Sequence, residues 1–396
     1  MRFDLGEVPP FWAMMTAMPG EFDLSVAKRR LADTHFDVLV VGGGITGAGC
    51  ALDAASRGLR TALVERDDFA AGTSSKSSKL IHGGLRYLQD DPRLVYEALH
   101  ERQRLRKNAP HLVQVIPFLL PVFRGSGGVI SKKLSRALGT ALWGYDLTGG
   151  LRIGRLHSRI SASDALRHMP SLDPDRLASS YLYYDAQADD ARLTLEVIRT
   201  AVLDHNAVAL NRAGVEAITK DAAGRASGAT VLVDGDLVEV RADAVINAAG
   251  VWSDEVRAID EGVHPQSIRP AKGIHISVPW DLIRNDIAAV IPVRSDGRSV
   301  FVVPWGDVTY IGTTDTDYDG PIDDPQCTAD DIAYLLDGIN DVVTRPISAA
   351  DIVGTWAGLR PLVASAPTQN TADLSRRHQV RLSHSGVVTV TGGKLT

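Results

Sequence analysis

The sequence predicts an α/β fold, in which a domain built on a parallel β-sheet carries an inserted domain with a mainly antiparallel β-sheet. Three observations predict it. A βαβ pattern begins near residue 36, two further apolar strands that run into glycine occur far along the chain, and segments of alternating polarity lie between them. Because the parallel strands are separated by such long stretches, we expect their domain to be discontinuous.

Residues 1–34 are expected to form an N-terminal extension that contains one short basic helix, SVAKRRLADTHF. An apolar stretch at residues 8–19 has the length of a signal-peptide core. Asp4 and Glu7 precede it and no small-residue cleavage site follows, so a signal peptide is disfavoured.

The first predicted strand is the continuous apolar and β-branched run at residues 36–41, FDVLVV, as expected for a parallel strand that is buried on both faces. A glycine turn, the Ala-rich helical segment AGCALDAASRG and a second strand at residues 61–65 complete a βαβ unit. Strands at residues 243–249 and 386–391 would extend the same sheet.

The inserted domain is predicted from alternating segments at residues 273–278, 299–304 and 308–315, which suit an antiparallel sheet. We assign residues 35–105, 190–265 and 350–396 to the discontinuous first domain. The second domain, which would cover the substrate, takes residues 106–189 and 266–349.

Composition excludes several classes of protein. With 44% hydrophobic and 23% charged residues, the chain of 396 residues resembles ordinary globular proteins rather than disordered ones. Its net charge of −6 argues against a nucleic-acid partner. Cys50 and Cys327 lack any metal-ligand spacing, so we predict no metal site and a reducing compartment. No apolar run reaches the roughly 20 residues that a membrane-spanning helix needs, so any membrane contact would be peripheral.

Gly42, Gly44 and Gly47 form a GxGxxG motif between the first strand and the Ala-rich helix, and Glu65 ends the second strand. These glycines permit a tight turn, a close approach of the backbone to a pyrophosphate, and close packing of helix and strand. A carboxylate at position 65 can accept hydrogen bonds from a ribose diol. The first domain is therefore predicted to be a Rossmann-like dinucleotide-binding domain.

The segment that follows, GTSSKSSKLIHGGLRYL at residues 72–88, favours FAD over NAD. It is rich in hydroxyl groups, glycines and cations, and such a loop can wrap an embedded cofactor. The absence of a second GxGxxG motif from the sequence disfavours a reductase with separate FAD and NADPH domains. The electron donor would then be the substrate itself.

At this point the sequence closely resembles the FAD-dependent, quinone-linked glycerol-3-phosphate dehydrogenases over residues 35–396. The motifs that carry the resemblance, in the order of the family, are VVGGGITGAGCALDAASRG, GTSSKSSKLIHGGLRYL, INAAGVWSDEV, AKGIHISVP, IGTTDTDY, WAGLRPL, LSRRH and VTGGKLT. The family is similar to the wider group of amino-acid-oxidase-like flavoproteins.

The resemblance implies oxidation of sn-glycerol 3-phosphate to dihydroxyacetone phosphate by hydride transfer to flavin N5, with electrons passed to a membrane quinone. It also implies a cytoplasmic homo-oligomer that is peripherally associated with the inner face of the plasma membrane. Two alternatives stay open: an oxidase that passes electrons to oxygen, and a FAD-binding shell without turnover. Members of the family continue after GGKLT into a further helix and a C-terminal helical domain, so we expect a truncated form here.

The resemblance places His82 and Arg86 at the flavin and the substrate. His82 is our first candidate for the general base, because imidazole titrates near working pH; a structural hydrogen bonder under the flavin is the alternative. Arg360, with Arg86, completes the predicted catalytic set. The other predicted substrate-binding residues are Tyr87, His275, Arg376 and Lys394, of which His275 could equally be a core histidine.

The predicted FAD contacts come from stretches that are far apart in the chain. The wrapping loop would supply Ser74, Ser75, Ser78, Lys79 and Gly84, in addition to the glycine motif and Glu65. By resemblance Val215 meets adenine, and Ala249 and Gly250 lie at the adenosine half. Gly312 and Thr313 would approach the ring, and the last contacts are assigned to Gly393, Lys394, Leu395 and Thr396.

A membrane-facing segment is a further hypothesis. Read as a helix from about residue 129, the sequence places aliphatic residues such as Leu134 and Leu138 at three- and four-residue spacing, with Lys132 and Lys133 near the start. This pattern suits a helix that lies in a lipid interface, and equally an amphipathic helix that packs on the core.

Overall fold

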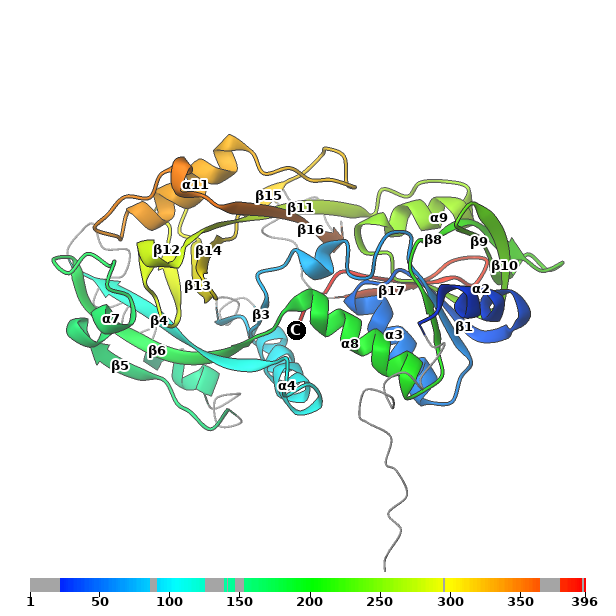
Figure 1. The fold of residues 1–396 in the computed structure, drawn as a ribbon, viewed down its shortest axis with the longest axis horizontal. Helices are drawn as coiled ribbons and strands as arrows, with labels where there is room; N and C mark the ends of the chain where they lie inside the picture. Colours follow the sequence, from blue (N-terminus) through cyan, green and yellow to red (C-terminus); the bar gives the residue numbers. More distant parts are fainter. Residues whose placement is uncertain are drawn as a thin grey trace, which may run out of the picture. The chain divides into compact units, whose positions relative to one another are not determined.

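The computed structural model describes residues 22–85, 91–124, 139–140, 142–146, 153–294, 296–363, 378–393 and 395–396. The chain divides into two compact units (Figure 1). Unit 1 comprises Met1–Ala71, Thr194–Gln266 and Gln379–Thr391, and unit 2 comprises Gly72–Leu193, Ser267–His378 and Gly392–Thr396.

Unit 1 is built on an eight-stranded sheet with the central order β17-β18-β10-β1-β2-β7. Its strands are β1 (His35–Val41), β2 (Thr61–Val64), β7 (Val208–Leu210), β8 (Ala213–Lys220), β9 (Ala226–Val233), β10 (Asp236–Asn247), β17 (Gln379–Leu382) and β18 (Val388–Thr391). Strands β7, β2, β1, β10 and β18 pair in parallel, whereas β8, β9 and β17 join by antiparallel pairing. The predicted parallel sheet of distant strands is therefore confirmed.

Both faces of this sheet are buried, which explains the uninterrupted apolar run of β1. Val38 and Val40 pack with the alanines of α3 (Ile45–Ser56) and with Ile198 of α8 (Asp190–Leu203), and α3 and α8 lie side by side in Figure 1. Leu39 and Val41 point to the other face, where they pack in one cluster with Leu31 of α2 (Leu24–Asp33). The other helices in the described part of unit 1 are η4 (Gly250–Trp252) and α9 (Ser253–Glu261).

Unit 2 contains a ten-stranded sheet with the main order β15-β11-β14-β13-β12-β4-β6-β3. Its strands are β3 (Leu80–Ile81), β4 (Gln114–Phe123), β5 (Ser158–Ser161), β6 (Leu177–Gln187), β11 (Ile268–Pro279), β12 (Ala288–Pro292), β13 (Ser299–Trp305), β14 (Val308–Gly312), β15 (Thr316–Asp317) and β16 (Gly354–Val363). Among the described strands of this second sheet, only β4 and β12 pair in parallel. The mainly antiparallel second sheet is confirmed, and its predicted segments are β11, β13 and β14.

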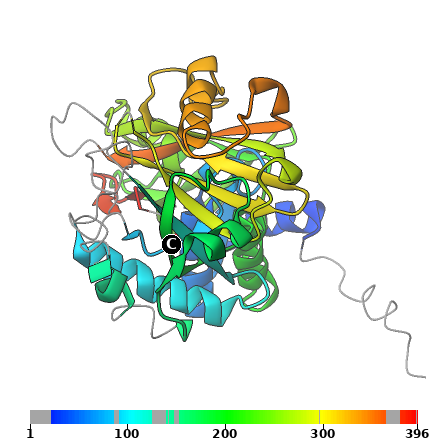
Figure 2. The same cartoon turned by 90° about the vertical axis from the view of Figure 1, so that its left-hand side faces the viewer.

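Helices cover both faces of the unit 2 sheet. On one face, α11 (Ala329–Asn340) and α7 (Ala162–His168) pack against Ile274 and Ile276 of β11; α11 is orange in Figure 2. On the other face, α4 (Pro92–Asn108) packs against β4 in a cluster that also contains Tyr310. Because side chains alternate along a strand, His275 points away from the α11 face. The short helices are η1 (Thr73–Ser75), α10 (Trp280–Ile283) and η5 (Ala349–Asp351).

The two units divide the chain at positions that differ from the predicted domain boundaries. Four stretches that we assigned from the sequence to the nucleotide-binding domain belong by compactness to unit 2: residues 72–105, 190–193, 350–378 and 392–396. The reason is strand pairing, because β3 joins β6 and β16 joins β11.

No described helix is long and apolar enough to cross a membrane. The described residues also contain no group of three or more histidine, cysteine or acidic side chains placed to hold a metal ion. The predicted interfacial helix from about residue 129, with Lys132, Lys133, Leu134 and Leu138, lies outside the described residues.

Candidate functional site

The glycine motif of unit 1 forms the turn between β1 and α3, and two of its glycines are required by close backbone contacts. Gly42 has φ +109°, and a Cβ there would lie 2.7 Å from the carbonyl oxygen of Ala248. A Cβ at Gly47 would lie 1.8 Å from the carbonyl oxygen of Gly42. Gly44 is the N-cap of α3 and brings no side chain to the start of the helix. The turn therefore fits a pyrophosphate, which needs a bare backbone and a helix N-terminus.

Glu65 follows β2 and its carboxylate is held against the same turn. One oxygen, Oε2, accepts a hydrogen bond of 2.7 Å from the backbone N–H of Gly43, and Oε1 accepts one of 2.8 Å from Asp67. Each carboxylate oxygen can accept a second hydrogen bond, so the group can also receive a ribose hydroxyl. The sequence analysis did not single out Gly43 as a site residue. The structure shows that it must be small, because a Cβ there would lie 2.9 Å from the Cβ of Glu65.

The remaining predicted nucleotide contacts of unit 1 lie on neighbouring elements. Val215 is partly buried in β8, and Ala249 directly precedes Gly250, which has φ +58° in η4. A feature not predicted is Arg66, whose guanidinium lies 5.2 Å from the centre of the Trp252 ring. A single arginine after Glu65 offers no sequence signal for that contact.

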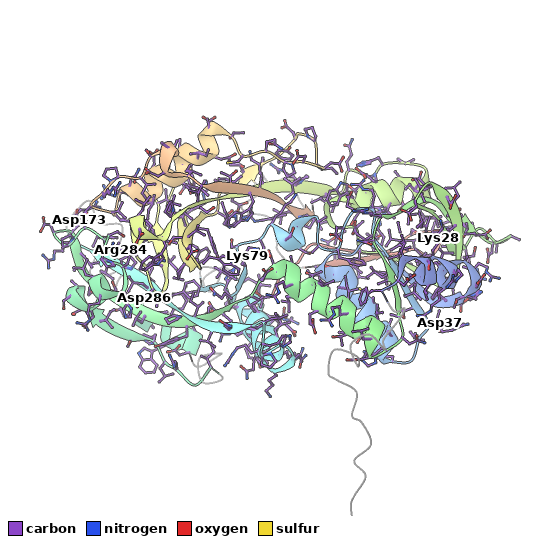
Figure 3. All side chains as sticks on the ribbon, in the orientation of Figure 1. Lys28, Asp37, Lys79, Asp173, Arg284 and Asp286 are labelled. Atoms are coloured by element: carbon purple, nitrogen blue, oxygen red, sulfur yellow. The ribbon has the colours of Figure 1, made fainter. Side chains whose placement is uncertain are left out.

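In unit 2, the predicted wrapping loop, which begins at residue 72, is held by hydrogen bonds with four residues from other parts of the chain. The buried carboxylate of Asp190 accepts hydrogen bonds from the N–H and hydroxyl of Ser77, at 3.0 and 2.7 Å, and lies 2.6 Å from Nζ of Lys79. The side chain of Lys79 is labelled among the sticks of Figure 3, beside the start of α8. Tyr310 and Trp356 donate to the carbonyl oxygens of Ser78 and Ser77, at 2.7 and 3.3 Å, and Ala188 donates its N–H to the Lys79 carbonyl at 2.9 Å.

His275 lies at the centre of this arrangement, with only 2% of its surface exposed. Its ring stacks on Trp356 at 4.6 Å between centres, and Nε2 lies 2.8 Å from the hydroxyl of Ser78. Burial first, and then the charges of Arg360 and Lys79, lower the pKa of His275 to about 3. The imidazole is therefore neutral at working pH. Among the described residues its Nδ1 has no hydrogen-bond partner.

Gly312, Thr313 and Arg360 adjoin the same histidine. A Cβ at Gly312 would lie 2.1 Å from Cδ2 of His275, so only glycine leaves room for the ring. Arg360 donates to the carbonyl of Thr314 at 3.1 Å and to the hydroxyl of Thr313 at 3.3 Å. Its other terminal nitrogen lies 3.3 Å from Asp315, a carboxylate that the sequence analysis did not single out.

His82 follows β3, and its ring centre lies 5.9 Å from that of Phe301. Phe301 pairs across the sheet with Gly312, which in turn pairs with His275, so the described geometry links the two histidines through neighbouring strands. The backbone turns at Gly84, which has φ +78°.

The end of the chain lies in the same unit. The hydroxyl of Thr396 donates to the His82 carbonyl at 3.2 Å, and Leu395 packs against the cluster that contains Ile81. Gly393 has φ +90°.

Several predicted site residues are placed without a contact that bears on their predicted roles. Ser74 is buried in η1, and Ser75 donates its hydroxyl to the carbonyl of Gly72 at 3.4 Å. Four predicted residues lie outside the described part of the chain: Arg86, Tyr87, Arg376 and Lys394.

Each unit, taken by itself, carries residues that bear on FAD binding. The unit 1 turn has the bare backbone and the carboxylate that an adenosine diphosphate moiety needs. In unit 2, Gly312, the neutral His275 and Arg360 lie on neighbouring strands and share one face of the sheet.

The profile of the FAD dependent oxidoreductase family matches residues 37–396. Glycerol-3-phosphate dehydrogenase 2 of Mycobacterium bovis is 41% identical over 382 residues, which cover 95% of this chain and 63% of that protein. The mitochondrial glycerol-3-phosphate dehydrogenase of Bos taurus is 39% identical over 380 residues, which cover 92% of this chain and 51% of that protein.

Solved structures give the same result. The crystal structure of glycerol-3-phosphate dehydrogenase from Bacillus halodurans complexed with FAD superposes with a TM-score of 0.73 at 32% identity, covering 94% of this chain and 63% of that one. The L-α-glycerophosphate oxidase of Mycoplasma pneumoniae shares the fold, with a TM-score of 0.68 at 18% identity, covering 91% of this chain and 89% of that one. The chain spans about half to two thirds of the length of the curated dehydrogenases that it matches. By its family profile, its glycine turn and its two-sheet architecture, it belongs to the FAD-dependent oxidoreductase family.

Proposed function

We propose that this protein oxidises sn-glycerol 3-phosphate to dihydroxyacetone phosphate. The observation that carries the proposal is the grouping of Arg360, Thr313 and neutral His275 on one sheet face, in a chain about 41% identical to named glycerol-3-phosphate dehydrogenases. When bound, FAD supplies the acceptor for the hydride that leaves the carbinol carbon of the substrate.

The proposed phosphate site is centred on Arg360. Its guanidinium is oriented by the carbonyl of Thr314 and by Asp315, and a guanidinium fork has the geometry to bind phosphate oxygens in pairs. Arg86, Arg376 and Lys394 are proposed to add cations, and Tyr87 a hydroxyl, on the basis of the sequence resemblance.

His82 is the proposed general base for the substrate hydroxyl. The second histidine, His275, is less suited to that role, because its Nε2 already contacts Ser78 and its pKa of about 3 makes it a weak base. We assign to His275 the orientation of the substrate or ring through its neutral nitrogen.

The first experiment is anaerobic reduction. The protein is reconstituted with FAD, and the flavin absorbance is followed on addition of glycerol 3-phosphate. Loss of the oxidised flavin band is expected. Retained flavin that glycerol 3-phosphate does not bleach, or a colourless protein that rejects FAD, would instead support the non-catalytic shell.

The Arg360→Ala variant tests the phosphate site in the same assay. A charge-assisted hydrogen bond contributes about 1.5–3 kcal/mol, so the concentration of substrate that gives half-maximal reduction should rise by about 10- to 100-fold, with flavin content retained. Arg294→Ala is the matched control, because Arg294 is 44% exposed and pairs with Asp341. Equal affinity in the two variants would remove Arg360 from the phosphate site.

A membrane quinone is the proposed acceptor, and oxygen is the alternative. Reduced enzyme is exposed to air, or to a soluble quinone analogue, and peroxide is measured. Rapid reoxidation by the quinone with little peroxide supports the dehydrogenase. Stoichiometric peroxide at a comparable rate in air would favour the oxidase.

A quinone acceptor further suggests peripheral association with the inner face of the plasma membrane. We include Trp143, which is 53% exposed, in this proposed surface. Flotation with anionic liposomes tests this, and Leu138→Glu should abolish binding; equal flotation of variant and parent would contradict it.

A further inference from the structure

Unit 2 buries a charged cluster beneath the turn that carries His82. Arg102 of α4, Asp185 of β6 and Tyr145 are 1%, 2% and 1% exposed. The Asp185 carboxylate accepts a hydrogen bond of 2.5 Å from Arg102 at Oδ1 and one of 2.7 Å from the Tyr145 hydroxyl at Oδ2. Burial of an ion pair is costly, and replacement by apolar side chains is often neutral or stabilising, so the cluster calls for an explanation other than stability.

The cluster is directed at one backbone group, the N–H of Gly83. This N–H donates to Oδ1 of Asp185 at 3.1 Å and to the Tyr145 hydroxyl at 3.0 Å. The contact is close, because a Cβ at position 83 would lie 2.4 Å from Leu99 and 2.5 Å from the Tyr145 hydroxyl. A charge-assisted hydrogen bond to a carboxylate is stronger than a neutral one.

The N–H of Gly83 shares a planar peptide unit with the carbonyl of His82. On the carbonyl side of that unit, the hydroxyl of Thr396 donates to His82 at 3.2 Å. On the preceding side, Ile81 pairs with Ala186, the residue next to Asp185 in β6. The backbone orientation of His82 is thus fixed by hydrogen bonds to the Gly83 N–H and to the His82 carbonyl, and by the pairing of the preceding strand, β3.

We infer that Asp185, Tyr145 and Arg102 are positioning residues for His82. Asp185 and Tyr145 hold the His82–Gly83 peptide plane through the Gly83 N–H, and Arg102 holds the Asp185 carboxylate in place through its hydrogen bond to Oδ1. The role of His82 in the reaction rests on the proposed function, whereas the hold on the peptide can be measured without it.

The test uses Tyr145→Phe, which removes the hydroxyl that contacts both Asp185 and Gly83 and leaves the Arg102–Asp185 pair intact. Tyr183→Phe is the matched control. Tyr183 is also buried, its ring lies 6.1 Å from that of Tyr145, and within the described residues its hydroxyl makes no hydrogen bond to Gly83 or Asp185.

Residues 82 and 83 form the only His-Gly pair in the sequence. Isotope labelling of histidine carbonyl carbons and glycine nitrogens therefore isolates the Gly83 amide in an NMR spectrum of the purified protein. We expect its hydrogen exchange to accelerate about tenfold in Tyr145→Phe and to stay at the parent rate in Tyr183→Phe. Equal exchange in the parent and both variants would overturn the inference.

Kinetics give the second readout. In Tyr145→Phe the rate constant for flavin reduction at saturating glycerol 3-phosphate should fall about tenfold, while half-saturation and flavin content stay within about twofold of the parent. Faster exchange with unchanged reduction would show that the peptide is held for stability alone and would overturn the positioning role. If the parent itself is not reduced, the proposed function fails, and the exchange rates alone decide whether the cluster holds the His82 peptide.

Discussion

His275 shows how a single buried side chain ties the site to the pH dependence of stability. Its lowered pKa of about 3 means that the folded protein keeps the ring neutral over a range in which an unfolded chain would protonate it. The unfolded state then binds more protons than the folded state between about pH 6.5 and pH 3. The contribution of the neutral ring to the free energy of unfolding is therefore at its maximum above pH 6.5, and it decreases as the pH falls toward 3.

We expect His275→Gln to flatten this dependence. Below about pH 6, the parent should lose about 1.4 kcal/mol of unfolding free energy per pH unit more than the variant, because glutamine does not titrate. Denaturant unfolding at a series of pH values measures the two slopes.

The control is His205→Gln, which makes the same substitution at an exposed histidine. A His275→Gln slope equal to that of the parent would show that His275 is protonated in the folded state.

At the level of single residues, the sequence could name His275 and Ser78 but not their contact. They are 197 residues apart, and only the pairing of β11 with its neighbours brings them together. Asp190, Asp315 and Asp185 were missed for the same reason. A buried carboxylate looks like a surface one in a sequence until its partners are known.

At the level of elements, α3 provides an internal comparison between two glycines. Gly47 faces the Gly42 carbonyl, whereas a Cβ at Gly49 would meet nothing within 4 Å. The same substitution in one helix therefore has opposite expected effects.

Gly47→Ala should weaken FAD binding by at least about tenfold and destabilise the protein by roughly 1–3 kcal/mol, because the added methyl group forces the turn away from α3. Gly49→Ala should leave FAD affinity unchanged and stabilise by about 0.5–1 kcal/mol through helix propensity. Flavin fluorescence titration and thermal melts measure both. Similar affinities in the two variants would contradict the assigned role of the turn.

Strands with a strong pattern of apolar residues could be predicted from the sequence. Strands whose place depends on pairing with distant parts of the chain could not. The apolar run of β1 identifies it because both of its faces are buried. In β4, Pro117 and Pro121 argue against an interior strand, since proline cannot donate to a ladder. The structure accommodates them because β4 pairs along its length with β6, whereas its pairing with β12 involves Phe118 and Leu119 and neither proline.

At the scale of the whole molecule, the residues predicted to bind the adenosine half all belong to unit 1, and the proposed substrate residues that the structure describes belong to unit 2. Nucleotide recognition and substrate recognition should therefore be separable by experiment. The predicted two-sheet architecture was accessible from sequence because glycine-terminated strands recur far along the chain, whereas the limits of each unit depend on long-range pairing.

We expect ADP alone to stabilise the protein, by about 2.7 kcal/mol at a concentration 100 times its dissociation constant. Adenosine 2′,5′-bisphosphate should stabilise it less at equal concentration, because the Glu65 carboxylate repels a 2′-phosphate. Thermal melts measure both ligands, and Arg360→Ala should respond as the parent does. Equal stabilisation by the two nucleotides would remove Glu65 from the ribose site.

The placement of β18 beside β10 has a consequence for synthesis on the ribosome. Asn247 of β10 reaches Thr389 of β18 across 142 residues of chain. Translation proceeds at about 5–20 residues per second, so β18 is synthesised roughly 7–28 seconds after the end of β10. During that interval the nascent polypeptide exposes an unpaired strand edge beside the glycine turn, which makes this edge a natural place for a chaperone to bind.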